Sequence, residues 1–131
     1  MKKFSISKFK TDSYDLVPLE LKDFIDFEVQ RIYFIDSKKQ DAYTGAHSHF
    51  VEKELFIVVK GSCVIQIDEG NGLCDIKLVE NECIYIMNNV WHHFEKMSSN
   101  CLITALSSTN YNPDRSDYVE DYDKFKTCLH L

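Results

Sequence analysis

Short runs in which apolar and polar residues alternate make up most of the chain, and β-branched and aromatic side chains are frequent in them. Alternation with a period of two is typical of β-strands that bury one face. These runs predict strands at residues 14–19, 27–35, 42–49, 54–60, 62–68, 73–79, 83–87 and 101–107. Their spacing of about ten residues favours an antiparallel sandwich or barrel.

Two short segments predict sharp reversals between these strands. Asp68-Glu69-Gly70-Asn71-Gly72 separates two β-branched runs, and glycine there supplies the positive φ that a hairpin loop requires. Lys60-Gly61 predicts a second tight corner. Both segments therefore favour antiparallel neighbours.

The end of the chain changes period. Apolar and aromatic side chains recur there at helical spacing, at Tyr118, Val119, Tyr122 and Phe125. Ser116 or Asp117 is available as an N-cap. We therefore predict one short C-terminal helix.

Length and composition place the chain among globular proteins. Its 131 residues suit a single domain, residues 1–131, which is long enough to bury about two-thirds of its unfolded surface. No apolar run approaches the ~20 residues that a membrane helix needs. Met1-Lys2-Lys3-Phe4-Ser5 contains basic residues but no apolar signal core follows it, so we expect a cytoplasmic protein.

Charge and cysteine content narrow the choice of partners. A net charge of −6 with two arginines, Arg31 and Arg115, argues against a nucleic-acid surface, because phosphate backbones are bound by clustered basic residues. The five cysteines are scattered in apolar runs, which favours free buried thiols. The composition thus favours neither a nucleic acid nor a membrane as partner, and it is compatible with one nucleotide-linked metabolite.

The strongest chemical signal is the pair His47 and His49. Side chains at i and i+2 on a strand point to the same side, so both imidazoles can enter one cavity. Imidazole titrates near neutrality, and it can take a proton from carbon and return it. Neutral imidazole also binds metals, so these residues allow either use.

The spacing from His47 to Gly61 reads HxHxxxxExxxxxxG, which resembles the first motif of the cupin superfamily. Residues 82–92 resemble the second motif, with His92 at its histidine position. This resemblance implies an all-β fold, an antiparallel jelly-roll (cupin) barrel with a short C-terminal helix.

The same resemblance supplies a metal-binding alternative. The ligands would be the three-histidine, one-carboxylate set of metal-dependent cupins, namely His47, His49, Glu54 and His92. Such donors suit iron, manganese, zinc or nickel. An exposed Glu54 at the start of a strand is the competing interpretation of that carboxylate. His93 would face away from His92 in an extended strand, as a surface residue or a contact behind the site.

A closer resemblance extends over most of the chain. Gly-x-His-x-His at residues 45–49 and Asp-Tyr-Val-x-Asp-Tyr-x-x-Phe at residues 117–125 are similar to the sugar 3,4-ketoisomerases. That family consists of small cupins acting on dTDP-4-keto-6-deoxyglucose, in pathways to 3-amino-3,6-dideoxysugars of lipopolysaccharide or other surface glycans. The resemblance implies a cofactor-free isomerase that moves a ketone from C4 to C3 through an enediol.

The resemblance also implies roles for particular residues. His47 and His49 inherit the proton shuttle, with His49 expected as the base and His47 assisting or reprotonating. Tyr33 matches a strand tyrosine that approaches the sugar, where its phenol would donate to the developing oxyanion; a core aromatic is the alternative. Arg31 shares the face of Tyr33 and is expected to pair with the nucleotide diphosphate.

Four further residues are expected to bind substrate, Trp91, His92, Glu54 and Thr44, and packing in the core or at the rim is the alternative for Trp91. Thr44 stands where the family usually has arginine, and Glu54 stands where compared ketoisomerases often have glutamine. The family also implies a homodimer with exchange of an N-terminal strand. Both C4 configurations of the product, gluco and galacto, are compatible with these residues.

Overall fold

The protein is described by a computed structural model for residues 1–129. A 3-10 turn, η1, covers Leu21–Asp23. The strands and the helix are, in chain order, β1 (Lys2–Ser5), β2 (Phe9–Lys10), β3 (Asp15–Leu16), β4 (Arg31–Asp36), β5 (Ser48–His49), β6 (Glu54–Lys60), β7 (Ser62–Asp68), β8 (Cys74–Val79), β9 (Glu82–Ile86), β10 (Trp91–Glu95), β11 (Leu102–Ser107), β12 (Tyr118–Val119) and α1 (Tyr122–Cys128).

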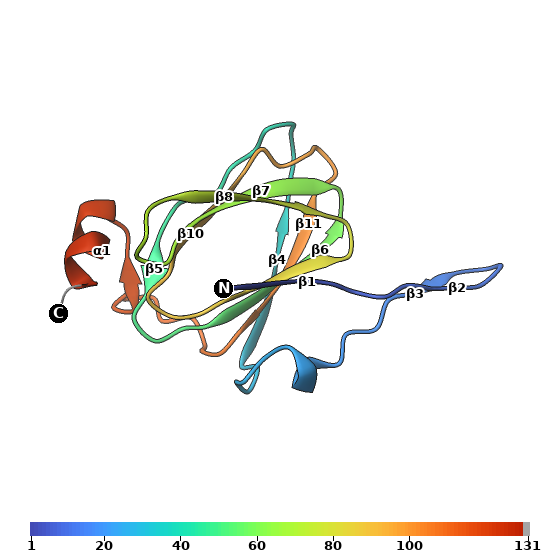
Figure 1. The fold of residues 1–131 in the computed structure, drawn as a ribbon, viewed down its shortest axis with the longest axis horizontal. Coiled ribbons are helices and arrows are strands. Elements are labelled where there is room, and N and C mark those ends of the chain that lie inside the picture. Colours follow the sequence, from blue (N-terminus) through green and yellow to red (C-terminus); the bar gives the residue numbers. More distant parts are fainter. Residues whose placement is uncertain (130–131) are drawn as a thin grey trace.

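Two antiparallel sheets form the body of the protein (Figure 1). One has the strand order β1-β9-β6-β11-β4, and the other has the order β10-β7-β8. The small β12-β5 pair lies next to α1, while the β2-β3 hairpin projects from the opposite side of the body. This arrangement confirms the predicted all-β jelly-roll class and the short C-terminal helix. Within residues 1–129 the hydrogen-bonded ladders remain separate sheets and do not close into a barrel.

The main core lies between the two large sheets. Phe56 and Ile84 come from the five-stranded sheet, Ile65 and Phe94 come from the three-stranded sheet, and all four are buried. Full burial of a side chain of this size stabilises the fold by roughly 1.5–3 kcal/mol. The alternation of apolar positions therefore predicted the faces that meet here.

A second apolar cluster covers the other face of the five-stranded sheet. Leu55 and Tyr85 of that sheet pack against Phe24, Phe27 and other side chains of the N-terminal third. This packing corrects the predicted strand at 27–35, which begins at Arg31, because Phe27 and Val29 pack over the sheet and Gln30 makes one backbone hydrogen bond to Ser107 just before β4.

Two other predicted strands are shorter than expected. The strand at 14–19 is reduced to β3, and the strand at 42–49 is reduced to β5. Before β5, residues 42–47 make single bridges, Ala42 with Met97 and His47 with His92. The prediction also missed β1 and β10, whose alternation is interrupted by charged and histidine side chains.

The C-terminal helix begins later than predicted. It starts at Tyr122, and the side chain of Asp121 caps it by accepting a hydrogen bond from Lys124 N at 2.8 Å. Tyr118 and Val119 instead form β12, which pairs with β5. Asp117 is not the helix cap, because its carboxylate accepts from Val51 N and Glu52 N.

The predicted corners are confirmed. Gly61 has φ 76°, and a Cβ there would lie 2.8 Å from Cys101 Cα, so glycine is required on both grounds. Asp68 Oδ1 accepts from Gly70 N and Gly72 N and closes the hairpin loop. All five cysteines are free, as expected, but Cys74 is exposed. In the described part of the chain, no helix has the length and apolarity needed to span a bilayer.

Candidate active site

A cavity of about 290 Å³ opens between the two sheets, and it collects most of the polar residues predicted for the site. β4, the segment before β5, β10 and the loop before β12 all contribute to its wall. Its lining residues are Arg31, Tyr33, Ile35, Thr44, Gly45, His47, Phe56, His92, His93, Phe94, Arg115 and Tyr118.

Strand alternation places the β4 residues of this wall. Arg31 and Tyr33 face the cavity, whereas Ile32 and Phe34 between and beyond them are 57% and 65% exposed on the other face. The guanidinium of Arg31 lies over the Tyr33 ring, 4.5 Å from its centroid. The predicted shared face of Arg31 and Tyr33 is therefore present.

Three histidines meet at the inner end of the cavity. The ring centroid of His47 lies 4.7 Å from that of His49 and 4.8 Å from that of His92. Backbone hydrogen bonds between His47 and His92, in both directions, hold the two segments together. His47 and His92 line the cavity, and His49 lies one ring behind, where it also contacts Tyr118 at 4.4 Å between centroids.

Glu54 forms the buried anionic centre of this cluster. It is 2% exposed, which excludes the interpretation of a solvated carboxylate. Tyr33 donates a short hydrogen bond to Oε2, while Oε1 lies 3.4 Å from His49 Nε2 and 3.5 Å from His92 Nε2. Burial alone would raise the pKa of Glu54, but its neighbours His49, His92 and Tyr33 outweigh burial and hold the pKa well below its usual value.

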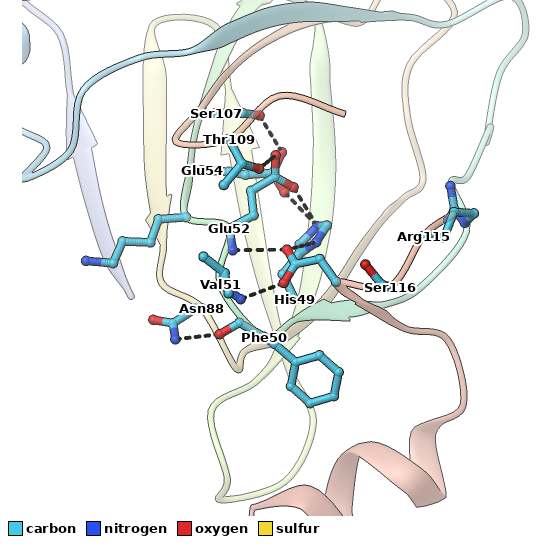
Figure 2. Close-up of polar contacts among 12 residues, drawn as sticks. His49, Phe50, Val51, Glu52, Glu54, Asn88, Ser107, Thr109, Arg115 and Ser116 are labelled. Atoms are coloured by element: carbon cyan, nitrogen blue, oxygen red, sulfur yellow. Dashed lines mark hydrogen bonds and ion pairs between the residues drawn. The ribbon is translucent and has the colours of Figure 1, made fainter. Parts of the chain in front are cut away.

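A second carboxylate engages His49 from the turn after β5 (Figure 2). Glu52 Oε2 lies 3.0 Å from His49 Nε2, and Glu52 Oε1 accepts from Thr109 Oγ1. Asp117 Oδ2 lies 3.3 Å from His49 Nδ1 without hydrogen-bond geometry. Burial lowers the pKa of His49, but Glu52 and Glu54 outweigh that effect and raise it to about 9.

His47 has the opposite electrostatic environment. Burial lowers its pKa to about 3, and the neighbouring His92 and His49 act in the same direction. At neutral pH the site therefore contains a neutral imidazole at the cavity and a protonated imidazole behind it. One proton acceptor and one proton donor lie 4.7 Å apart between ring centroids.

The donors of the metal-binding alternative also come together. Suitable atoms of His47, His49, Glu54 and His92 lie within 4.8 Å of one another. Glu54 Oε1 and His92 Nε2 are buried without a hydrogen-bond partner. These donor types and this spacing fit a divalent transition metal, so the geometry accommodates that alternative as well.

Trp91 and His93, the two neighbours of His92 in sequence, lie in different places. Trp91 does not line the cavity; its ring packs 5.6 Å from that of Phe125 and 5.3 Å from that of Tyr122, between β10 and α1. His93, expected to face away, contributes to the cavity wall beside His92.

Glu52, Arg115 and Tyr118 were not predicted for the site. Glu52 and Arg115 lie outside regular strands, so no periodicity marked them, and Tyr118 was assigned to the helix. The motif at residues 117–125, which resembles that of the sugar 3,4-ketoisomerases and has Tyr118 as its second residue, was the available signal for Tyr118.

Comparison with known proteins shows which family this chain resembles. The family model described as "FdtA: WxcM-like, C-terminal" matches residues 1–130. The TDP-4-oxo-6-deoxy-alpha-D-glucose-3,4-oxoisomerase of Aneurinibacillus thermoaerophilus is 32% identical over 115 residues, which is 87% of this chain and 81% of the relative.

Solved structures agree with that result. A 3,4-ketoisomerase from Helicobacter canadensis superimposes with a TM-score of 0.88 at 31% identity, covering 99% of this chain and 97% of the other. QdtA, a sugar 3,4-ketoisomerase from Thermoanaerobacterium thermosaccharolyticum in complex with TDP, gives a TM-score of 0.87 at 25% identity, covering 98% and 93%. These relatives do not favour the metal-dependent alternative. The chain belongs to the FdtA, WxcM-like family.

Proposed function

We propose that this protein is a sugar 3,4-ketoisomerase that converts dTDP-4-keto-6-deoxyglucose, a dTDP-linked 4-keto-6-deoxyhexose, to its 3-keto isomer. The observation that carries the proposal is the pair His47 and His49 at the inner end of a cavity, in a chain whose relatives are named for this reaction. The two histidines differ in proton affinity, and His49 is the stronger base of the two once it is unprotonated.

The proposed reaction is a tautomerisation. The C4 carbonyl acidifies the C3 proton, a base removes that proton, the electron pair forms the C3–C4 double bond, and the C4 oxygen takes up a proton to give the enediol. A proton is then delivered to C4 while the C3 hydroxyl loses its own, so the ketone has moved to C3. Oxidation at C3 balances reduction at C4, so the chain's own acids and bases suffice and no redox cofactor is required.

We assign the proton transfers to His47 and His49, and we keep His49 as the base. Glu52 and Glu54 increase its proton affinity, which strengthens it as an acceptor whenever it is unprotonated. His47 lies between His49 and the cavity and, being neutral, assists the transfer to and from the sugar.

Tyr33 is assigned to the developing oxyanion. Burial, and next the charge of Glu54, raise the pKa of its phenol above the ordinary value, so it remains a hydrogen-bond donor at neutral pH. In the substrate complex we expect the Tyr33 hydroxyl to donate to the sugar oxygen on which negative charge develops, and no longer to Glu54. A preorganised donor of this kind stabilises charge that develops in the transition state.

Arg31, Thr44 and His92 are assigned to substrate binding. Arg31 stacks on Tyr33 and keeps its planar fork for the diphosphate. Thr44 Oγ1 accepts from Phe94 N at 3.0 Å and fixes the wall where the family usually has arginine. Glu54 contributes indirectly, by holding Tyr33 and the histidines.

The test is incubation of chelator-treated protein with dTDP-4-keto-6-deoxyglucose in deuterium oxide, followed by proton NMR of the sugar. We expect the 3-keto isomer with deuterium at C4, its couplings giving the gluco or galacto configuration, and no product from His49→Asn. If sugar signals change only after divalent ions are added, with bound metal at one equivalent, the metal-dependent enzyme replaces this proposal.

We further propose a homodimer that exchanges an N-terminal strand. Ile32 and Phe34 expose apolar surface on β4, an edge strand, and the projecting β2-β3 hairpin exposes Phe9 and Leu16 (Figure 1). Light scattering after size-exclusion chromatography should give twice the chain mass, and Phe34→Glu should give the mass of one chain. A wild-type monomer would contradict the proposal.

We also propose that residues 1–131 act as one domain in the cytoplasm, supplying the 3-keto precursor of a dideoxyaminosugar for a surface glycan. Cell fractionation with an antibody against the chain should recover it with cytoplasmic enzymes. Recovery with the membrane or outside the cell would contradict this placement.

A further inference from the structure

The two arginines of the chain, 31 and 115, line the same cavity although they are far apart in sequence. Among the residues described, no lysine lines that cavity, so these guanidiniums are its permanent cations. Arg31 was predicted for the site, but Arg115 lies in the loop between β11 and β12 and was not. The chain has net charge −6, so these two guanidiniums give the cavity wall local positive charge within an acidic protein.

The two arginines are held in matching ways. Arg31 lies over the Tyr33 ring at 4.5 Å, and Arg115 lies over the Tyr118 ring at 3.8 Å from the centroid. Both tyrosines line the cavity. A guanidinium that stacks through its face keeps the N–H groups of its edge for a planar, bidentate anion.

Tyr111 joins the two arginines. The guanidinium of Arg31 lies 5.3 Å from the centroid of the Tyr111 ring, and the Tyr111 hydroxyl accepts a hydrogen bond from Arg115 Nη1 at 3.4 Å. Arg31 therefore lies over the face of this exposed ring, and Arg115 lies at its hydroxyl. Their separation is bridged by a single side chain, which suits a ligand with two linked anionic groups.

Local turns fix the position of Arg115. Its N–H donates to Asn112 O, its carbonyl accepts from Tyr118 N, and its own φ is 54°, a value that few side chains adopt without support. Asp114 Oδ1 accepts from Ser116 N and closes the adjacent turn. The loop thus holds Arg115 at the cavity instead of leaving it on a freely moving segment.

We infer that Arg115 is a second diphosphate-binding residue, which together with Arg31 holds the nucleoside diphosphate of the substrate at the cavity mouth. The inference rests on the proposed function, because the diphosphate belongs to the proposed substrate. It also accounts for Thr44, since Arg115 restores to the same cavity wall a positive charge that Thr44 lacks.

Glu120 competes with the ligand in this arrangement. Its Oε1 accepts from Arg115 Nε at 2.8 Å and also from Nη2, and both side chains are roughly half exposed. Exposed ion pairs contribute little to stability, so a diphosphate can take over the edge of Arg115. Removing the Glu120 charge should therefore improve binding, whereas removing Arg115 should weaken it.

The test is calorimetric titration with TDP and with thymidine monophosphate. For Arg115→Gln we expect the dissociation constant for TDP to rise about tenfold to a hundredfold, the loss typical of one charge-assisted hydrogen bond. Glu120→Gln should bind TDP more tightly than wild type, and Arg115→Gln/Glu120→Gln should match Arg115→Gln. The preference for TDP over the monophosphate should shrink in both variants that lack Arg115.

Lys60→Gln is the matched control, because Lys60 forms an equivalent exposed pair with Glu80 away from this cavity. Its affinity for TDP should equal that of wild type. If wild type binds TDP and isomerises the sugar while Arg115→Gln binds TDP equally well, the inference on Arg115 is overturned and the proposed function stands. If wild type neither binds TDP nor isomerises the sugar, the proposed function itself fails.

Discussion

The core between the sheets and the histidine cluster at the end of the cavity are buried to the same degree, yet different forces hold them. Ile65 and Ile84 are fully buried and satisfied by apolar packing. His49 and Glu54 are 3% and 2% exposed, and charged partners hold them while Glu54 Oε1 has no hydrogen-bond partner. Burying charge costs free energy that apolar packing does not cost. Burial therefore serves stability in one region and chemistry in the other.

The substitution His49→Asn should distinguish the histidine cluster from the apolar core by the largest effect on activity. Loss of the base should lower kcat by roughly a hundredfold to ten-thousandfold, because general acid–base help is of that size. The measurement is the initial rate of isomerisation on protein whose fold is verified by circular dichroism. His47→Asn should fall within the same range, since both histidines belong to one shuttle.

A small loss of activity in His49→Asn would contradict the assignment of His49 as the base. A folded His49→Asn protein that keeps more than about a tenth of wild-type activity would remove His49 from proton transfer, since that loss is below the usual range. Retained exchange of the C3 proton with solvent, without product, would instead make His49 the donor to C4.

Leu78→Ala is the converse change in the apolar core. Leu78 is fully buried and does not line the cavity, so the substitution should lower the free energy of unfolding by about 2–5 kcal/mol. Urea denaturation measures this change, and kcat of the folded protein should remain that of wild type. A large fall in kcat with unchanged stability would contradict the separation of core and site.

The apolar core followed closely from the sequence, and the site followed only in part. Alternation in residues 62–68 marked which side chains face inward, because regular strands repeat every two residues. His47 and His49 stand in a segment that was predicted as a strand but makes mostly single bridges. The proximity of His47 and His49 was therefore predicted from the spacing of the motif and not from regular strand pairing.

Two of the residues that were missed come from irregular backbone. Glu52 reaches His49 from a turn, and Arg115 reaches the cavity from a loop position with positive φ. Neither position has a period that a sequence pattern can reveal. Trp91 packs against Phe125 of α1 and does not line the cavity, although it is adjacent to His92 in sequence.

The pH dependence tests which charge state the cluster uses. Since the pKa of His49 is raised to about 9, it holds its proton below that pH and cannot accept another. With His49 as base, kcat/KM should rise about tenfold per pH unit below about 9 and level off above it. Initial rates across that range, with enzyme stability checked at each pH, provide the measurement. A flat profile that falls above about 9 would make His47 the base.

Glu54→Gln should give the smallest and most selective effect. The amide keeps the shape of the side chain and can still accept from Tyr33, but it removes one of the charges that raise the pKa of His49. The midpoint of the pH profile should therefore move below about 9, and Glu52→Gln should move it in the same direction. Glu80→Gln is the control, because Glu80 pairs with Lys60 far from the cluster and should leave the midpoint unchanged. If Glu54→Gln leaves the midpoint in place, the buried carboxylate acts on Tyr33 alone, and the histidines do not depend on its charge.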